Sequence, residues 1–219
     1  MRYFILLLFT TSILAWTPQT RQYLAITAFR AFPTDVRLAL NHHRKSFLSG
    51  ASVDLSGKTG NDLINDGCRI SEEISTMLAT RPDFRIIANK LGKLMAISAQ
   101  LSDPYLDSKS PHADNYRNYV ERKLDCFFFA GIPLTFKDIS PKDVCVRLFH
   151  VPELGKAHLN AIEQDYKIYH DSSNFDDLSA AFGSGSLLFS DTCTEMVIIT
   201  SLLWSQASGN AADAAIFSR

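Results

Sequence analysis

Apolar residues recur along most of this chain at intervals of three and four, the spacing that places them on one face of a helix. The first such stretch follows Thr17 and Pro18, which suit the cap and the first turn of a helix. Pro33 interrupts the pattern, and Thr34 can cap a second helix that runs toward a stop at Gly50. We therefore expect two helices before residue 51.

The middle of the chain continues the helical pattern. Residues 57–60 have the composition of a loop, and a third helix is expected over residues 62–80. A long apolar helix is expected over residues 84–101. It should end before Pro104, because a residue that precedes proline disfavours helical geometry.

The second half adds further helices and ends in the most apolar one. The run at 187–207 is apolar on all sides, so it belongs in the centre of a bundle. The glycines and serines of 182–186 predict a turn before it. Alternation typical of a strand occurs only around 127–134. The pattern predicts an all-α, single-domain, multi-helix bundle. The other expected helices lie at 116–129, 141–149 and 158–169.

Length and charge narrow the class of protein. A chain of 219 residues with 46% hydrophobic residues can bury the core of one domain. The formal net charge is -1, and the basic residues are dispersed. Nothing in the bulk charge therefore favours nucleic acid or an anionic membrane surface as a partner.

The first fifteen residues have the pattern of a signal peptide. Arg2 precedes an apolar run at 3–9, and Ala15 supplies the small residue before a cut. The run is shorter than the roughly 20 residues that span a bilayer, and no later stretch is expected to span one. We expect residues 1–15 to be removed and residues 16–219 to be exported to a periplasm or the exterior. The alternative is a buried N-terminal helix.

Export gives the four cysteines a structural meaning. Two disulfides can form in an oxidising compartment, and the sequence leaves three connectivities open. The alternative is four buried thiols. No two cysteines have the close spacing of a thiolate zinc site. The four are Cys68, Cys126, Cys145 and Cys193.

Motifs of common catalytic sites are missing from the sequence. It has no phosphate-binding glycine loop, no G-x-S-x-G turn and no HExxH helix. The glycine-serine run at 183–186 is better interpreted as a connector than as a nucleophile loop. The adjacent His42 and His43 point in divergent directions on a helix, so they are unsuited to sharing a metal.

Four short motifs nevertheless follow one another in a recognisable order. The first motif is Trp16-Thr17-Pro18-Gln19-Thr20-Arg21, followed by Leu24-Ala25. The second is the segment 47–54, which contains a leucine, a glycine-alanine pair and an aspartate. The third runs from Leu91-Gly92 to Pro104, and the fourth covers residues 112–125. In this order they resemble the zinc-dependent phospholipase C superfamily, which includes fungal zinc nucleases acting on single strands. Its members commonly begin with Trp directly after the signal peptide. The resemblance covers residues 16–125 and continues weakly into the last helix.

The resemblance implies a helical fold and a phosphodiester-hydrolysing centre. In that family three zinc ions are held by His and Asp or Glu side chains and by the amine and carbonyl of the N-terminal Trp. The ions activate a water and clamp the phosphoryl oxygens. The free amine of Trp16 would arise only after processing, so export and metal binding would be linked in such an enzyme.

This chain departs from the family at most ligand positions. An arginine is a fixed cation and cannot replace a metal-binding imidazole, while alanine and leucine offer no ligand. A three-zinc centre therefore cannot be assembled. Arg21 occupies the position of the family's first His, and Ala96 and Gln100 occupy the positions of its central His and Asp. Leu106 lies where the family has the His after the proline, and Tyr116 or Arg117 lies where it has the Glu.

Four candidate metal ligands remain, namely Trp16, Asp54, Asp66 and His112. They could form one weak zinc site, with fewer ions than the family's three, from Asp54, the Trp16 terminus and either Asp66 or His112. Alternatively, Trp16 anchors the N-terminus in the core, and Asp54 caps the loop after Gly50.

Three functions are compatible with these residues. The leading hypothesis is a non-catalytic relative that keeps the scaffold and binds a ligand or partner, such as a phospholipid or a protein, through the old metal cleft. The alternative is a phosphodiester hydrolase, phospholipase C-like or nuclease-like, with a reduced metal site. The third is an unrelated helical bundle with a structural role. In the first two hypotheses the Trp16 terminus points into the same cleft as Asp54 and Gln100. An unrelated bundle does not require this arrangement.

Overall fold

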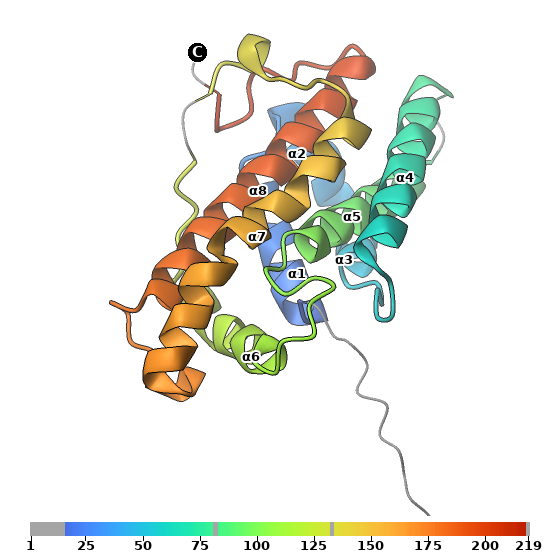
Figure 1. The fold of residues 1–219 in the computed structure, drawn as a ribbon. Coiled ribbons are helices and arrows are strands. Elements are labelled where there is room, and N and C mark those ends of the chain that lie inside the picture. Colours follow the sequence, from blue (N-terminus) through green and yellow to red (C-terminus); the bar gives the residue numbers. More distant parts are fainter. Residues whose placement is uncertain (1–15, 81–82, 132–133, 218–219) are drawn as a thin grey trace, which may run out of the picture.

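The computed structural model describes residues 16–80, 83–131 and 134–217, and within these ranges the fold is all-α (Figure 1). Its β pairing there is limited to an isolated bridge between Leu134 and Phe217. The expected signal peptide and its cleavage point at Ala15 lie outside the described residues. The helices are α1 (Pro18–Phe29), α2 (Thr34–His42), α3 (Arg44–Ala51), α4 (Gly60–Thr80), α5 (Phe84–Leu101), α6 (Ala113–Lys123), α7 (Val144–Tyr169) and α8 (Ala180–Gln206), with short 3-10 turns at Leu124–Cys126, Phe136–Asp138 and Ser172–Asn174.

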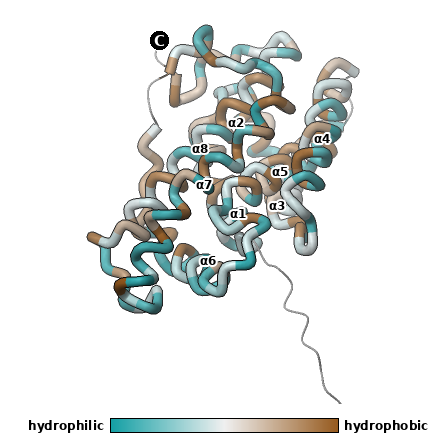
Figure 2. The backbone as a smooth tube through the Cα atoms, in the orientation of Figure 1, coloured by the Kyte–Doolittle hydropathy of each residue, from teal (hydrophilic) through white to brown (hydrophobic). Residues whose placement is uncertain are grey.

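The apolar helix α8 lies in the middle of the bundle, as its sequence predicts. It packs along α7 and against α1, α5 and α4. Figure 2 shows apolar residues gathered where the central helices meet, whereas α6 is mostly hydrophilic. By length and composition α8 could cross a membrane, and it is the one helix of the described residues that could. However, 72% of its most apolar window is buried by the other helices, as expected of a core helix.

A glycine pair brings α3 and α5 into backbone contact. A Cβ on Gly92 would lie 2.0 Å from the carbonyl oxygen of Phe47, and one on Gly50 would lie 2.0 Å from that of Asn89. The helix ends at Ala51, one residue after the stop expected at Gly50. Gly50 lies inside α3, where the absence of a side chain allows the two helices to touch.

Other helix boundaries also differ from the sequence prediction. The single helix expected after Thr34 is divided into α2 and α3 at His43. Thr34 is the first helical residue and Pro33 is the cap, without a capping hydrogen bond from a side chain. The helix expected over 116–129 ends at Lys123, and Phe127 already has an extended backbone. By contrast, the Thr17 cap is confirmed, since its side chain accepts a hydrogen bond from the Thr20 amide.

The remaining two errors concern residues that usually break helices. The separate helices expected over 141–149 and 158–169 form one continuous helix, α7, with Pro152 inside it. The turn expected over 182–186 belongs to α8, which starts at a Ser179 cap. In both cases the residues that should break the helix lie in long helices packed against each other. Burial of that packed surface outweighs the local preference.

One disulfide fastens α4 to α7. It joins Cys68 to Cys145, whereas Cys126 is exposed and free and Cys193 is buried and free. Disulfide formation is thus realised for one pair. The alternative that all four cysteines are buried thiols is wrong.

Candidate functional site

The Arg21 guanidinium is the centre of a buried polar site beside the N-terminal end of α1. Its Nη1 donates to the Trp16 carbonyl oxygen at 2.6 Å and to Gln100 Oε1 at 3.0 Å. Its Nη2 donates to the Val53 carbonyl oxygen at 2.7 Å. Arg21 lies in the first turn of α1, Gln100 in the last turn of α5, and Val53 in the loop after α3. Three oxygen atoms from distant parts of the sequence thus surround one cation.

Burial dominates the electrostatics of this site. Arg21 is only 4% exposed, and desolvation lowers its pKa, while the charge of Asp54 opposes that shift. An arginine pKa starts so high that the group stays charged. Asp54 itself is at the solvent side, where its carboxylate accepts a hydrogen bond from the Ser56 amide at 2.9 Å. That bond lowers the pKa of Asp54.

Asp103 and Arg117 form a buried ion pair. The Asp103 carboxylate accepts hydrogen bonds from Arg117 Nε at 2.8 Å and from the Tyr105 amide at 2.7 Å. The backbone of Trp16 acts on the pKa of Asp103 as well, and it lowers it. Burial raises the pKa of Asp103, and the Arg117 guanidinium opposes the rise. Arg117 Nη1 also contacts the exposed Asp114 at 2.9 Å.

The other two candidate ligands have partners elsewhere. Asp66 forms ion pairs with Lys58 and with Arg69, and these bonds lower its pKa. His112 stacks on the ring of Tyr166 with centroids 4.1 Å apart, and its Nε2 lies 3.9 Å from Glu163. Each of these side chains has a role in holding neighbouring elements together.

The four candidate ligands do not fit a zinc centre in this arrangement. No group of three or more His, Cys, Asp or Glu side chains able to hold a metal occurs among the described residues. Only Trp16 and Asp54 have a common neighbour, and that neighbour is the guanidinium of Arg21. A metal ion at the Trp16 carbonyl would meet a fixed positive charge there, which Coulomb repulsion disfavours.

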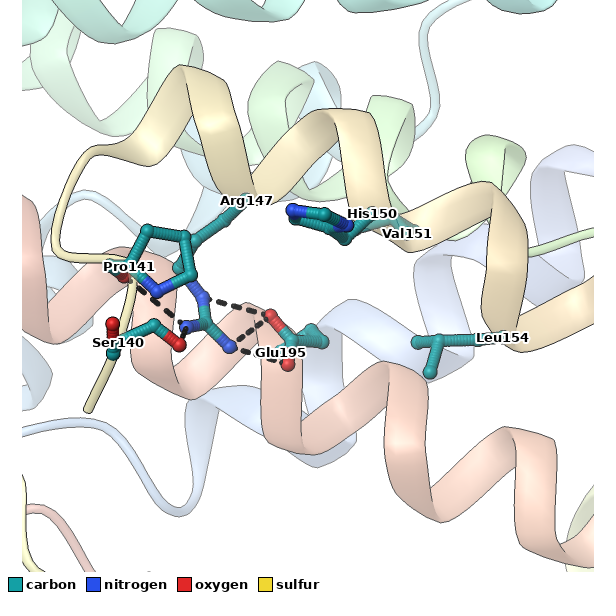
Figure 3. A pocket seen from close by; sticks show the side chains of 7 residues that line it. All are labelled: Ser140, Pro141, Arg147, His150, Val151, Leu154 and Glu195. Atoms are coloured by element: carbon teal, nitrogen blue, oxygen red, sulfur yellow. Dashed lines mark hydrogen bonds and ion pairs between the residues drawn. The ribbon is translucent and has the colours of Figure 1, made fainter. Parts of the chain in front are cut away.

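A groove between α7 and α8 contains a second charged pair (Figure 3). Arg147 on α7 donates from Nε and Nη2 to both carboxylate oxygens of Glu195 on α8, at 2.5 to 3.0 Å. Its Nη1 donates to the carbonyl oxygens of Ser140 and Pro141 at 3.4 and 3.3 Å. The guanidinium thus fixes the loop before α7 to both helices, in the forked geometry that arginine favours.

The α7–α8 groove consists of two adjoining hollows that share Ser140, Arg147 and Glu195. Their volumes are about 310 Å³ and about 500 Å³, within the range of small-molecule sites. The charges of Arg147 and Glu195 offset each other, so the pair gives the floor a polar surface without a net charge. The remaining lining residues are six apolar ones, Pro141, Val151, Leu154, Leu134, Ile139 and Ile198, and four polar ones, His150, Thr135, Asp138 and Thr194.

Neither charged pair was anticipated from the sequence. Arg147 and Glu195 are 48 positions apart, and Asp103 and Arg117 are 14 apart. An isolated charged residue inside an apolar helical stretch is the signal that could have found them, because such residues are buried only with a partner. Glu195 is such a residue, since it lies beside the apolar run of the last helix.

No protein-family model matches this sequence, and no curated protein matches it. The family resemblance therefore rests on the motifs of the N-terminal half and on their order.

Proposed function

We propose that this protein is an exported, non-catalytic helical protein, related in fold to the zinc-dependent phospholipases C, in which Arg21 provides the positive charge that a metal provides in that family. One observation carries the proposal. The Arg21 guanidinium is bound by the Trp16 carbonyl and by Gln100, two positions at which the family resemblance places metal ligands.

The arrangement of these residues also favours a relative over an unrelated bundle. Gln100 lies 79 residues after Arg21, yet it shares the guanidinium with the Trp16 carbonyl, and Asp54 is close enough to act on the pKa of Arg21. The Cys68–Cys145 bond supports export, because disulfides persist in oxidising compartments.

The same guanidinium argues against hydrolysis. A fixed, buried cation binds oxygen atoms but cannot lower the pKa of a water and deliver it as a nucleophile, which is the task of the zinc ions in the family. A phosphodiester hydrolase with a reduced metal site is the alternative. It would need ligands that Asp66 and His112, held by their own partners, do not supply.

The α7–α8 groove is a better candidate for ligand binding than the Arg21 site. The Arg21 site is filled, since the side chains of Trp16, Arg21 and Gln100 are all buried. The groove is open, six apolar side chains line its walls beside four polar ones that include Asp138, and its central charged pair is neutral as a whole. These properties suit a small uncharged molecule with an apolar body, such as the acyl or ring portion of a lipid.

Metal content and hydrolysis test the non-catalytic assignment. The protein, purified after processing and dialysed against zinc, should retain no stoichiometric zinc by elemental analysis. It should leave a chromogenic phosphodiester such as p-nitrophenylphosphorylcholine uncleaved. Turnover that depends on zinc and is lost on adding a chelator would establish the hydrolase alternative instead.

An uncharged fluorophore tests the groove. N-phenyl-1-naphthylamine should bind the protein with enhanced emission, and Leu154→Trp, which fills part of the groove, should weaken binding by about tenfold, or 1.4 kcal/mol. Leu187→Trp is the matched control, because Leu187 is 59% exposed on α8 and does not line the groove. Equal binding by both variants would remove the groove as the binding site.

A further inference from the structure

Glu195 is the more exposed member of the charged pair in the α7–α8 groove (Figure 3). Its side chain is 20% exposed, and that of Arg147 is 10% exposed. All three guanidinium nitrogens of Arg147 are directed at oxygens of the protein. Nε and Nη2 donate to Glu195, and Nη1 donates to the carbonyl oxygens of Ser140 and Pro141. The floor of the groove therefore presents a carboxylate to a ligand and keeps the guanidinium engaged.

The second hollow of the groove, of about 500 Å³, adds further hydrogen-bond acceptors. Asp138 lines it together with Glu195, and an ionised carboxylate only accepts hydrogen bonds. The Thr194 hydroxyl donates to the Ser190 carbonyl oxygen at 3.0 Å, so its own oxygen can accept from a ligand. The Ser140 hydroxyl can donate or accept, and it therefore fits either kind of ligand. The two carboxylates decide the choice, and they require a ligand that donates a hydrogen bond.

Charge disfavours an acidic head group in this hollow. Among the described residues that line it, Asp138 and Glu195 are negative, and Arg147 is positive but bonded within the protein. A ligand carboxylate or phosphate would face both carboxylates. An ammonium would have to leave water for Glu195, which Arg147 already binds on both oxygens, and burying an incompletely paired charge costs more than burying a hydroxyl. A neutral head that donates a hydrogen bond fits best.

We infer that the groove binds an uncharged amphiphile whose hydroxyl head donates a hydrogen bond to Glu195, and that it rejects the corresponding carboxylic acid. The head lies in the second hollow, and the apolar body extends toward Pro141, Val151 and Leu154 in the first. The ligand class is an alcohol with a long chain or a ring body rather than a fatty acid. Glu195 determines this specificity, because it offers the acceptor and engages Arg147. The inference rests on the proposed role of the groove as a ligand site.

An alcohol and its methyl ether test the donated hydrogen bond in the wild-type protein. 1-Decanol and 1-methoxydecane share the chain and the oxygen, but only the alcohol can donate. Burial of apolar surface alone would favour the ether, which has the additional methyl group. We expect the alcohol to bind about tenfold more tightly, measured by displacement of N-phenyl-1-naphthylamine and by isothermal titration calorimetry. Equal or tighter binding of the ether would overturn the inference.

Glu195→Gln tests the exclusion of acids. The substitution keeps the shape of the side chain and removes the charge that pairs with Arg147, so the guanidinium becomes available to a ligand carboxylate. The ratio of the decanol affinity to the decanoate affinity at pH 8 should fall by about tenfold relative to the wild type. Glu153→Gln is the matched control, because it removes the same charge from an α7 side chain that is 64% exposed and does not line the groove. The control should keep the wild-type ratio, and an equal ratio in all three proteins would overturn the role of Glu195.

The outcomes separate this inference from the proposed function. If neither decanol nor the fluorophore binds, the groove is not a ligand site and both proposals fail. If the fluorophore binds but decanol does not displace it, or if protonated decylamine binds more tightly than decanol, the groove remains a ligand site and the assignment of a hydroxyl head fails. The comparison of alcohol and ether uses the wild-type protein, so it decides the inference even if Glu195→Gln does not fold.

Discussion

Replacing Gly92 with alanine should force α3 away from α5 at the point where their backbones touch. The new Cβ would lie 2.0 Å from the Phe47 carbonyl oxygen and 2.9 Å from the Ala51 amide nitrogen. Both are backbone atoms inside α3, so neither can rotate out of the way as a side chain would. The helices must separate or tilt, and the core next to them must open.

The magnitude follows from two opposing terms. Overpacking a core typically costs about 1–3 kcal/mol, and contact with fixed backbone atoms places this substitution near the upper end. Alanine stabilises the helix by about 1 kcal/mol relative to glycine, because it loses less backbone entropy on folding. The net loss should be about 2 kcal/mol, which in a chain of this size lowers the midpoint of thermal unfolding by about 4–8 °C.

Equilibrium unfolding in urea is the assay, with Gly183→Ala as the matched control. Gly183 is also helical, but a Cβ there would meet nothing within 4 Å. The control should therefore gain up to about 1 kcal/mol from helix propensity alone. The reasoning would be refuted if Gly92→Ala were as stable as the wild type or gained stability as the control does.

Three further predictions follow from the cysteines and from one surface carboxylate. The Cys68–Cys145 bond joins residues 77 positions apart, so its reduction should lower the free energy of unfolding, measured in urea, by about 4 kcal/mol. A loss under about 1 kcal/mol would contradict a structural role for this bond. A thiol reagent should modify the exposed Cys126 at once and Cys193 only on unfolding, since burial raises the pKa of the latter thiol; rapid labelling of both would be evidence against the packing of α8. Hydrogen bonds from Lys58 and Arg69 lower the pKa of Asp66, so its carboxylate contributes stability above its unfolded pKa of about 3.9 and loses it as the pH falls. The difference in urea midpoint between Asp66→Asn and the wild type should therefore shrink from pH 6 to pH 3, and a constant difference would contradict this assignment.

The helical class was predictable because the three- and four-residue periodicity is local and strong. The apolar run at the C-terminus identified the central helix α8, and α5 has the predicted bounds. The errors are at glycines and a proline. Gly183, Gly185 and Pro152 are residues that usually break helices, but here they lie inside helices whose packing surfaces were not visible in the sequence.

The candidate site was predictable only in part. Arg21 and Gln100 entered the sequence analysis only as residues that replace metal ligands, and the structure joins them to the candidate ligand Trp16 through hydrogen bonds of the Arg21 guanidinium. Their meeting at one point depends on how α1 packs against α5, which periodicity does not specify. The Arg147–Glu195 pair joins two helices whose neighbourhood is a tertiary property, so no local pattern could have identified the two residues as partners.

The most direct test of the account is a crystal structure of the processed protein grown with zinc and measured at the zinc absorption edge. The account predicts the Arg21 guanidinium against the carbonyl oxygen of Trp16 and no anomalous peak within bonding distance of that oxygen. An anomalous peak bound to Trp16, with Arg21 displaced from Gln100, would contradict the replacement of the metal by arginine and restore the case for a hydrolase.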